Sequence, residues 1–286
     1  MGGGSIILVV AAVLVGLAGL TLAYGAASWR RSSRHWLDRL AAGRRPSPPG
    51  SVDFAALGQL PPPVQRYFRA VLRDGQPRVI GVEIEHHGQF DLGESVARWK
   101  PFTSRQRVIL DRPGFLWDAR IALAPGVAVR VHDGYAAGEG RLHASLLGLI
   151  PLADLAGPGE VARGELFRFL AEAAWYPTAL LPGPSVRWQA VDAQSARVFL
   201  SDGELEVDLL FHFDAAGRLD TVRAEARGRT VQGRVEPTPW LGRFWNYEER
   251  GGQRIPLDGE VAWLLPTGAR PYWRGTIRSI HYDFAA

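Results

Sequence analysis

Cysteine is absent from this 286-residue sequence. A chain without cysteine has no disulfide, no thiolate zinc site, no cysteine nucleophile and no lipidated N-terminal cysteine. The motifs G-x-S-x-G, H-E-x-x-H and S-x-x-K of nucleophilic and zinc enzymes are also missing. The glycine-rich stretch Gly138–Arg141 (GEGR) opens no helix, which makes it a poor dinucleotide site. The sequence therefore names no catalytic motif, and it predicts no metal site and no cofactor.

Lysine is nearly absent too, since Lys100 is the only lysine among 33 basic residues. The net charge of +4 is unevenly distributed along the chain. Residues 25–50 alone carry +5, from six arginines against Asp38, so the rest of the chain sums to −1. A nearly neutral folded part lacks the basic surface that nucleic-acid-binding proteins present. We therefore expect no nucleic-acid partner.

The longest uncharged run is Ser5–Tyr24, which is 20 residues long and mostly apolar. A helix of that length spans about 30 Å, the thickness of the hydrocarbon core of a bilayer. A cleaved signal peptide is the competing interpretation, but it would have a charged first segment, which MGGGS lacks. Myristoylation is excluded because Ile6 stands where serine or threonine is needed. We assign residues 1–28 as a single transmembrane anchor.

Residues 29–51 follow as a basic juxtamembrane segment and a proline-rich linker, GRRPSPPGS at Gly43–Ser51. By the positive-inside rule, this segment favours a cytoplasmic domain at the bacterial inner membrane, while a periplasmic domain stays open. The same charges would attract anionic lipid by roughly 1 kcal/mol each. Trp29 and Trp36 fit the aromatic belt of a membrane interface. The charges in question are those of Arg30, Arg31, Arg34, Arg39, Arg44 and Arg45.

The remainder, residues 52–286, reads as one α+β domain. A helix is predicted over Pro61–Arg73, which has prolines in its first turn, apolar residues at helical spacing and Gly75 beyond its end. About a dozen short stretches with an alternating apolar pattern then predict antiparallel strands, separated by turn signals such as Pro125-Gly126 and Asp202-Gly203. We expect a large curved antiparallel sheet, a half-open barrel that wraps one or two helices. The expected strands are Val79–Phe90, Val96–Lys100, Arg105–Asp111, Phe115–Leu123, Val127–Tyr135, Gly138–Ala144, Val186–Val191, Ala196–Leu200, Leu205–Phe213, Leu219–Ala226, Phe244–Glu249, Glu260–Leu265 and Tyr272–Tyr282.

A second helix is predicted in the gap between the two sets of strands, at Gly164–Pro182. Helical spacing places Glu165, Arg168 and Glu172 on one face, where the guanidinium can bridge both carboxylates. Such a face is usually solvated, and then each pair contributes only a few tenths of a kcal/mol. The alternative is that the face points into the protein at a polar cleft.

A second candidate polar site lies on the predicted hairpin Phe115–Tyr135. If Pro125-Gly126 is a two-residue turn, then Asp118, Arg120, Asp133 and Tyr135 share one face of the sheet. Two neighbouring carboxylates would have one pKa raised unless the arginine lies between them. The alternatives are an ordinary cross-strand ion pair, or a one-residue slip that scatters the four residues over both faces.

Eight tryptophans belong to the predicted domain, most of them on strands or at strand ends. Because the indole N–H needs a partner even when buried, such a set suits either core packing or the wall of an apolar cavity. We include Trp117, Trp175, Trp188 and Trp263 among the candidate ligand-binding residues, together with the polar residues of the helix and the hairpin. The others are Trp99, Trp240, Trp245 and Trp273.

Four segments together resemble a bacterial family of unknown function whose members often carry an N-terminal membrane segment. They are PGFLWDARIAL (113–123), GELFRFLAEAAWYPTALLP (164–182), GEVAW (259–263) and PYWRG (271–275). The resemblance covers most of residues 55–284 and implies no particular activity. More distantly, the pattern of strands around a helix is similar to the lipoprotein-carrier fold, which implies a half-open barrel with an apolar cavity for acyl chains.

Three hypotheses for function follow. The first is a membrane-anchored binding module with an aromatic-lined apolar cavity for a lipid or other amphiphile, whose acidic head group Arg168 or Arg120 would hold. The second is a scaffold or interaction domain with no small ligand. The third is a hydrolase that uses a pair of carboxylates as acid and base.

Overall fold

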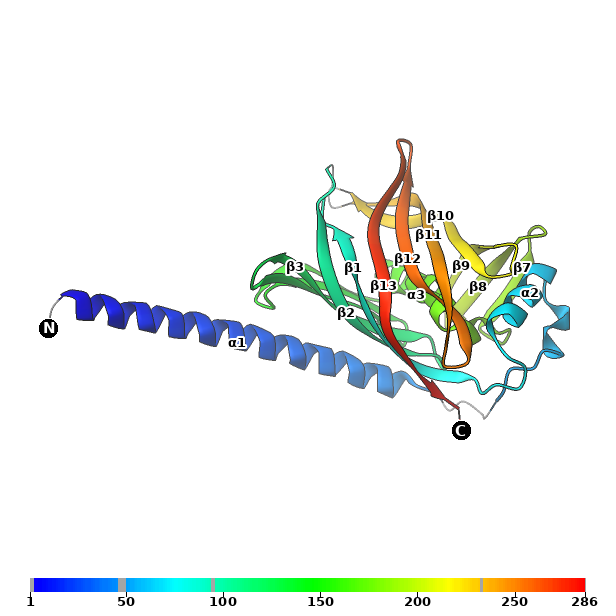
Figure 1. Ribbon diagram of the computed structural model, residues 1–286, viewed down its shortest axis with the longest axis horizontal. Coiled ribbons are helices and arrows are strands. Elements are labelled where there is room, and N and C mark those ends of the chain that lie inside the picture. Colours follow the sequence, from blue (N-terminus) through cyan, green and yellow to red (C-terminus); the bar gives the residue numbers. More distant parts are fainter. Residues whose placement is uncertain (1–2, 46–49, 94–95, 232–233, 286) are drawn as a thin grey trace.

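The computed structural model describes residues 3–45, 50–93, 96–231 and 234–285. One long helix, α1 (Gly3–Gly43), projects from a curved sheet, and the other helices lie against or beside that sheet (Figure 1). The other helices are η1 (Ala56–Gln59), α2 (Pro62–Val71), α3 (Glu160–Ala171), η2 (Glu172–Trp175) and η3 (Pro177–Leu180). The strands are β1 (Val79–Asp91), β2 (Trp99–Ile109), β3 (Gly114–Ala124), β4 (Val127–Ala136), β5 (Glu139–Leu146), β6 (Ile150–Gly157), β7 (Val186–Ala190), β8 (Ser195–Asp202), β9 (Leu205–Phe213), β10 (Leu219–Val231), β11 (Arg234–Arg250), β12 (Gln253–Leu265) and β13 (Gly268–Phe284).

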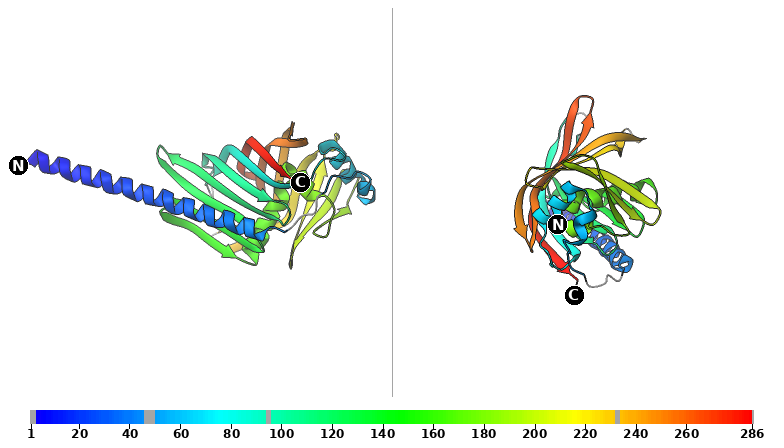
Figure 2. Two further views of the ribbon diagram at one scale, coloured as in Figure 1. Left: turned by 90° about the horizontal axis from the view of Figure 1, so that it is seen from below. Right: turned by 90° about the vertical axis from the view of Figure 1, so that its right-hand side faces the viewer.

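The described strands form one 13-stranded sheet in the order β6-β5-β4-β3-β2-β1-β13-β12-β11-β10-β9-β8-β7. The first strand pairs with the last in the middle of the sheet, so the two halves of the domain are joined there. The edges are β6 and β7, and the barrel is therefore not closed. This confirms the predicted α+β fold, a large curved antiparallel sheet with helices inside its curve (Figure 2).

The strand prediction differs from the structure most clearly at β2, β6 and β11, and β11 begins at Arg234 rather than at the predicted Phe244. Val96–Lys100 and Arg105–Asp111 were expected as two strands, but β2 runs through both from Trp99 to Ile109. Strand β6 was not expected at all, because Pro151 and a bulge at Leu152 interrupt its alternating pattern.

Helix α3 crosses the concave side of the sheet, from the edge strand β6 to the opposite edge strand β7. It contacts β4 and β5 in one half of the sheet and β9 and β10 in the other. Leu166 and Leu170 are fully buried, as the helical pattern requires, but Phe167 and Phe169 on the other sides of the helix are buried as well. The first turn of the helix is exposed at Glu160 and Arg163, whereas from Glu165 onward the side chains are buried or largely buried on every side.

Helix α1 runs without interruption past residue 28 to Gly43, and its second half packs on the convex side of β3 and β4. Trp36 and Leu40 form a small apolar cluster with Leu116 and two neighbours, Ile109 and Ala136. Trp29 is 4% exposed. Burial against the sheet corrects the expectation that Trp29 and Trp36 lie in a membrane interface. Residues 46–49 of the predicted linker lie outside the described residues.

Within the described residues, one helix is long and apolar enough to cross a membrane. This candidate span, Ile7–Gly43, lies in α1, and its most apolar part is not buried by the rest of the protein.

Candidate ligand-binding site

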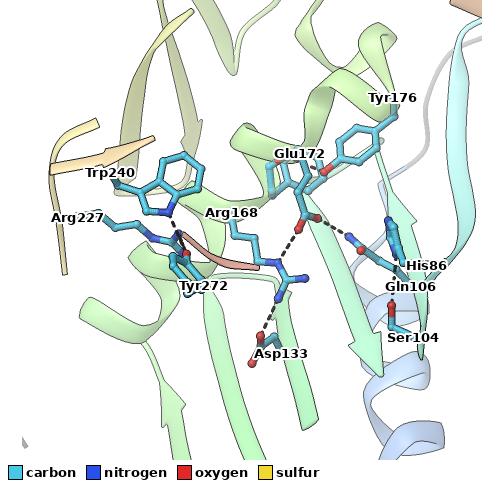
Figure 3. Close-up of polar contacts among 11 residues, drawn as sticks. His86, Ser104, Gln106, Asp133, Arg168, Glu172, Tyr176, Arg227, Trp240 and Tyr272 are labelled. Atoms are coloured by element: carbon cyan, nitrogen blue, oxygen red, sulfur yellow. Dashed lines mark hydrogen bonds and ion pairs between the residues drawn. The ribbon is translucent and has the colours of Figure 1, made fainter. Parts of the chain in front are cut away.

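Arg168 is the centre of a polar cluster on the concave side of the sheet (Figure 3). Its Nη1 donates to Asp133 Oδ2 of β4 at 2.6 Å, and its Nε donates to Glu172 Oε1 at 2.7 Å. The second oxygen of Glu172 accepts from Gln106 Nε2 of β2 at 2.6 Å. The guanidinium also lies over the ring of Trp117, 4.7 Å from its centroid. The helix and hairpin candidates therefore meet at one place, with Arg168 bridging Glu172 and Asp133 rather than Glu172 and Glu165.

Two carboxyl groups in this cluster are held away from their ordinary titration range. Burial raises the pKa of Asp133, opposed by Arg168 and reinforced by Glu172. Burial raises the pKa of Glu165 well above its usual value, and the nearby Asp133 adds to this. Glu165 is 8% exposed, and its Oε2 has no hydrogen-bond partner among the described residues. Burial thus favours the protonated form of Glu165, beside the ion pair of Arg168 with Asp133 and Glu172.

A neutral histidine lies on the other side of Glu172. His86 of β1 is 2% exposed, and its Nδ1 lies 3.3 Å from Ser104 Oγ. Burial lowers the pKa of His86 to about 3, and the positive charge of Arg168 contributes. Its ring packs against Trp175, with centroids 4.9 Å apart. The indole N–H of Trp175 and the Nε2 of His86 both lack a partner among the described residues, so this wall of the cluster carries unused hydrogen-bonding capacity.

A second arginine, Arg227, lies on the concave side among aromatic rings. Arg227 of β10 is half-buried, and its guanidinium lies 5.0–5.9 Å from the ring centroids of Phe167, Trp240 and Trp263. It donates to the hydroxyl of Tyr272 at 3.3 Å, which also accepts from Trp240 Nε1 at 2.9 Å (Figure 3). Within the described part of the chain, no carboxylate oxygen lies within 4.0 Å of it. Arg227 therefore presents a cation on an aromatic platform.

The predicted hairpin register is wrong by one residue. Asp118 lies opposite His132 and Trp117 opposite Asp133, because a bulge between Ala122 and Ala124 adds a residue beside the turn. The four candidates are thus divided between the two faces of the sheet. Asp133 and Tyr135 point to the concave side, where Tyr135 donates to Asp202 at 2.8 Å, while Asp118 and the exposed Arg120 point to the convex side.

Asp118 instead holds helix α1 to the sheet. Its oxygens accept from Trp29 Nε1 at 2.9 Å and from Ser33 Oγ at 2.7 Å. His132, fully buried, stacks on Trp29 at 3.8 Å and lies 2.9 Å from Ser33 Oγ through its Nε2. Burial alone would raise the pKa of Asp118, but the bonds from His132, Trp29 and Ser33 outweigh it and lower the pKa. We call Trp29, Ser33, Asp118 and His132 the helix clamp.

The candidate tryptophans lie in three places. Trp117 and Trp175 pack in the polar cluster. Trp263 stacks on Tyr272 at 5.5 Å beside Arg227 and remains half-exposed. Trp188 lies apart, where it packs against Phe68 and Phe211 and donates to Leu180 O. Sequence reasoning missed Arg227, Gln106, His86 and Tyr272, because their meeting depends on strand pairing across the whole sheet.

The fold and the site together define a class of protein: an open antiparallel half-barrel that encloses a helix and a buried charged cluster behind one long apolar helix. The chain belongs to a family of unknown function (DUF6920), whose model matches residues 58–282. This confirms the resemblance to such a family. No curated protein matches the chain.

Two solved structures are similar to this chain over 72% of its length. One is a LolA superfamily protein from Nitrosomonas europaea, at 10% identity and a TM-score of 0.38, with 87% of that protein covered. The other is a β-barrel-like protein with a domain of unknown function (DUF1849) from Brucella abortus, at 9% identity and a TM-score of 0.22, with 99% of that protein covered.

Proposed function

We propose that this protein is a membrane-anchored binding module that holds a lipid or similar amphiphile on the concave side of its sheet. The acidic head group of the ligand binds Arg227, and its apolar tail lies along the neighbouring aromatic side chains. The observation that carries the proposal is the aromatic platform under a half-buried guanidinium with no carboxylate partner within the described chain. An arginine in such a position is suited to a bidentate hydrogen bond with a carboxylate or phosphate.

Arg227 is better suited to bind the head group than Arg168 or Arg120, the two arginines that the sequence suggested for this role. Arg120 is exposed on the convex side of the sheet. Arg168 already donates to Asp133 and Glu172, so an anion there would have to displace a buried carboxylate. The charge of Arg227 reaches Asp133 and Glu165 only at longer range, where it opposes the rise of both pKa values.

Apolar surface for the tail is supplied by aromatic side chains that stay partly exposed around Arg227. Phe90 lies edge-on to Tyr272 at 6.3 Å, and Tyr272 stacks on Trp263. Trp273 and its cross-strand neighbour Val261 are also half-buried, and Trp273 packs against Phe102 and Trp175. Each methylene group that such a wall removes from water contributes about 0.8 kcal/mol, so a short acyl segment supplies most of the binding free energy.

Helix α1 supplies the anchor in this proposal. Its apolar stretch would cross the bacterial inner membrane once, and the arginines after it favour a cytoplasmic domain in contact with anionic lipid. Fusions of a cytoplasmic and a periplasmic reporter to the C-terminus measure this orientation. Activity of the periplasmic reporter alone would show that the domain lies in the periplasm instead.

The full chain, purified in a mild detergent and transferred to lipid nanodiscs, tests the binding function. Native mass spectrometry should detect a retained lipid or fatty acid, and a fluorescent fatty acid should bind and be displaced by an unlabelled one. A chain that carries no lipid and binds no fatty acid would overturn the proposal and favour the interaction scaffold.

A carboxylate-pair hydrolase is the second candidate, favoured by the raised pKa of two neighbouring acids, Asp133 and Glu165. An acid whose pKa is raised towards neutrality can donate a proton to a leaving group. Slow hydrolysis of an ester lipid by the wild-type chain, lost in Glu165→Gln, would support this candidate. Recovery of the intact ester after prolonged incubation would rule out the hydrolase.

A further inference from the structure

We propose that the hairpin joining β5 to β6 inserts into the surface of the bilayer from which α1 emerges. This membrane-facing hairpin comprises Ser145–Ala153, and the occupant of its exposed side is the lipid surface itself. The inference rests on the membrane anchor proposed for α1, but not on the bound amphiphile.

The position of the hairpin is set by direct contact with α1 at the end of the apolar run. Gly25 follows Tyr24, the last residue of that run. A Cβ atom at Gly25 would lie 2.8 Å from Leu147 O and 2.7 Å from Leu149 Cγ. Gly148, whose φ of 73° suits glycine, would meet Gly25 O at 2.7 Å if it carried a Cβ. The helix backbone and the turn thus touch at the level where the apolar span ends. In the left view of Figure 2, the turns that join the green strands lie beside the blue helix α1.

The helix clamp and the apolar cluster at its far end hold this level fixed. From Gly25, α1 continues unbroken through Trp29 to Leu40, which at 1.5 Å per residue is about 23 Å of helix. Trp29, Trp36 and Leu40 are all buried against the sheet. The hairpin therefore cannot rise from the membrane surface unless α1 detaches from the sheet.

The composition of the hairpin suits lipid better than water. Ser145–Ala153 reads SLLGLIPLA, which contains no charged residue, whereas turns at a protein surface are normally polar. Ile150 and Leu152 are each 57% exposed, and Leu155 on the same edge strand is 49% exposed. Each such side chain gains about 1.5–3 kcal/mol when it is removed from water.

Charges on α1 lie where lipid phosphates would be. Arg30, Arg31 and Arg34 are exposed, and they follow Gly25 by five to nine residues, which is about 8–14 Å along the helix. Long arginine side chains reach back over that distance to the head-group layer. The apolar hairpin would thus contact the acyl chains, and the basic part of α1 beside it would contact the lipid phosphates.

Because the natural chain has no cysteine, single cysteine variants of the full chain can carry an environment-sensitive fluorophore at chosen depths. Leu152→Cys reports on the hairpin, Leu17→Cys on the span, and Glu204→Cys on the far end of the domain. Glu204 lies beside Asp202, which is 4.0 Å from Arg45 beyond the end of α1. The end of α1 at Gly43 is about 27 Å along the helix axis from Gly25.

The labelled proteins are reconstituted in vesicles of phosphatidylethanolamine and phosphatidylglycerol, with and without brominated acyl chains. We expect brominated lipid to quench the fluorophore at Leu152 as well as at Leu17, and to leave the fluorophore at Glu204 unquenched. Quenching at Leu17 without quenching at Leu152 would overturn the hairpin contact while the anchor stands. Protection of Leu152 from both lipid and aqueous quenchers would mean that a second copy covers the edge, and it would also overturn the proposal. Absence of quenching at Leu17 would overturn the anchor and the hairpin contact together.

Discussion

The two faces of the hairpin β3–β4 carry one aspartate each, in adjacent cross-strand pairs, and the pKa values of the two are shifted in opposite directions. Asp118 on the convex face accepts hydrogen bonds from Trp29 and Ser33, and these bonds lower its pKa despite burial. Asp133 on the concave face has Arg168 as its partner and a raised pKa, and its Oδ1 has no hydrogen-bond partner among the described residues. The same strand pair therefore holds one aspartate whose pKa is lowered by its hydrogen bonds and another whose pKa is raised by burial despite its ion pair.

This difference separates a structural contact from a candidate site. The helix clamp satisfies its carboxylate and fixes α1 to the sheet. The concave cluster leaves hydrogen-bonding groups unused at Glu165, Asp133, His86 and Trp175. Buried polar groups without partners cost free energy, so these groups are places where a water molecule or a ligand would be bound.

The largest expected effect is the loss of the central cation of the concave cluster. Arg168→Leu leaves Asp133 and Glu172 buried without their partner, and we expect the free energy of unfolding to fall by about 3–5 kcal/mol. Chemical denaturation of the full chain in detergent measures it. The matched control is Arg105→Leu, whose side chain is 85% exposed and pairs with Glu85. It should change stability by less than about 1 kcal/mol, and equal effects of both variants would mean that Arg168 is solvated.

A smaller effect is expected on the convex face. Asp118→Ala removes the acceptor of both Trp29 and Ser33, which should cost about 1–3 kcal/mol and loosen α1 from the sheet. The measurement is limited trypsin cleavage after the exposed Arg30 and Arg31, which should become faster. Asp220→Ala, at an aspartate whose side chain is 48% exposed and pairs with His212, is the control. Unchanged cleavage in Asp118→Ala would show that the apolar contacts alone hold the helix.

The third effect is a gain in stability that depends on pH. The pKa of Glu165 is raised in the folded protein, so the folded state keeps a proton that the unfolded chain loses above its ordinary pKa of about 4.5. Wild-type stability therefore falls as the pH rises above about 4.5, and each pH unit over which only the folded state is protonated costs about 1.4 kcal/mol.

Glu165→Gln removes this titration and keeps the shape of the side chain. We expect it to be more stable than wild type at pH 7, with the advantage shrinking as the pH falls towards 4. Parallel unfolding curves from pH 4 to pH 8 measure it. A constant difference between the two proteins across that range would mean that Glu165 titrates normally in the fold.

The fold was predictable because it depends on local patterns. Alternating stretches identified most strands, and proline in the first turn marked α2. The candidate site was only partly predictable. Helical spacing placed Arg168 and Glu172 together, but whether Asp118 or Asp133 faced them depended on one bulged residue at Ala122–Ala124. No local pattern distinguishes such a bulge from a regular turn.

Contacts between residues that are distant in the chain could not be predicted from the sequence, for a different reason. The arginine-rich segment after the span has the composition of a membrane interface, yet Trp29 and Trp36 pack on the sheet because Asp118, His132 and Leu116 provide matching partners there. Arg227 was not singled out, since its aromatic neighbours come from α3, β11 and β12, which are distant in the chain.

The most direct test of the central claim compares the affinity of the full chain for a fluorescent fatty acid and for the matching fatty alcohol. Arg227→Gln removes the cation of the aromatic platform, and Arg223→Gln removes an exposed arginine from the same strand. A charge-assisted hydrogen bond is worth about 1.5–3 kcal/mol, so Arg227→Gln should weaken binding of the acid by roughly ten- to a hundredfold. Binding of the alcohol should be unchanged in both variants, and Arg223→Gln should resemble wild type for both ligands. Equal affinity of wild type and Arg227→Gln for the acid would contradict the account.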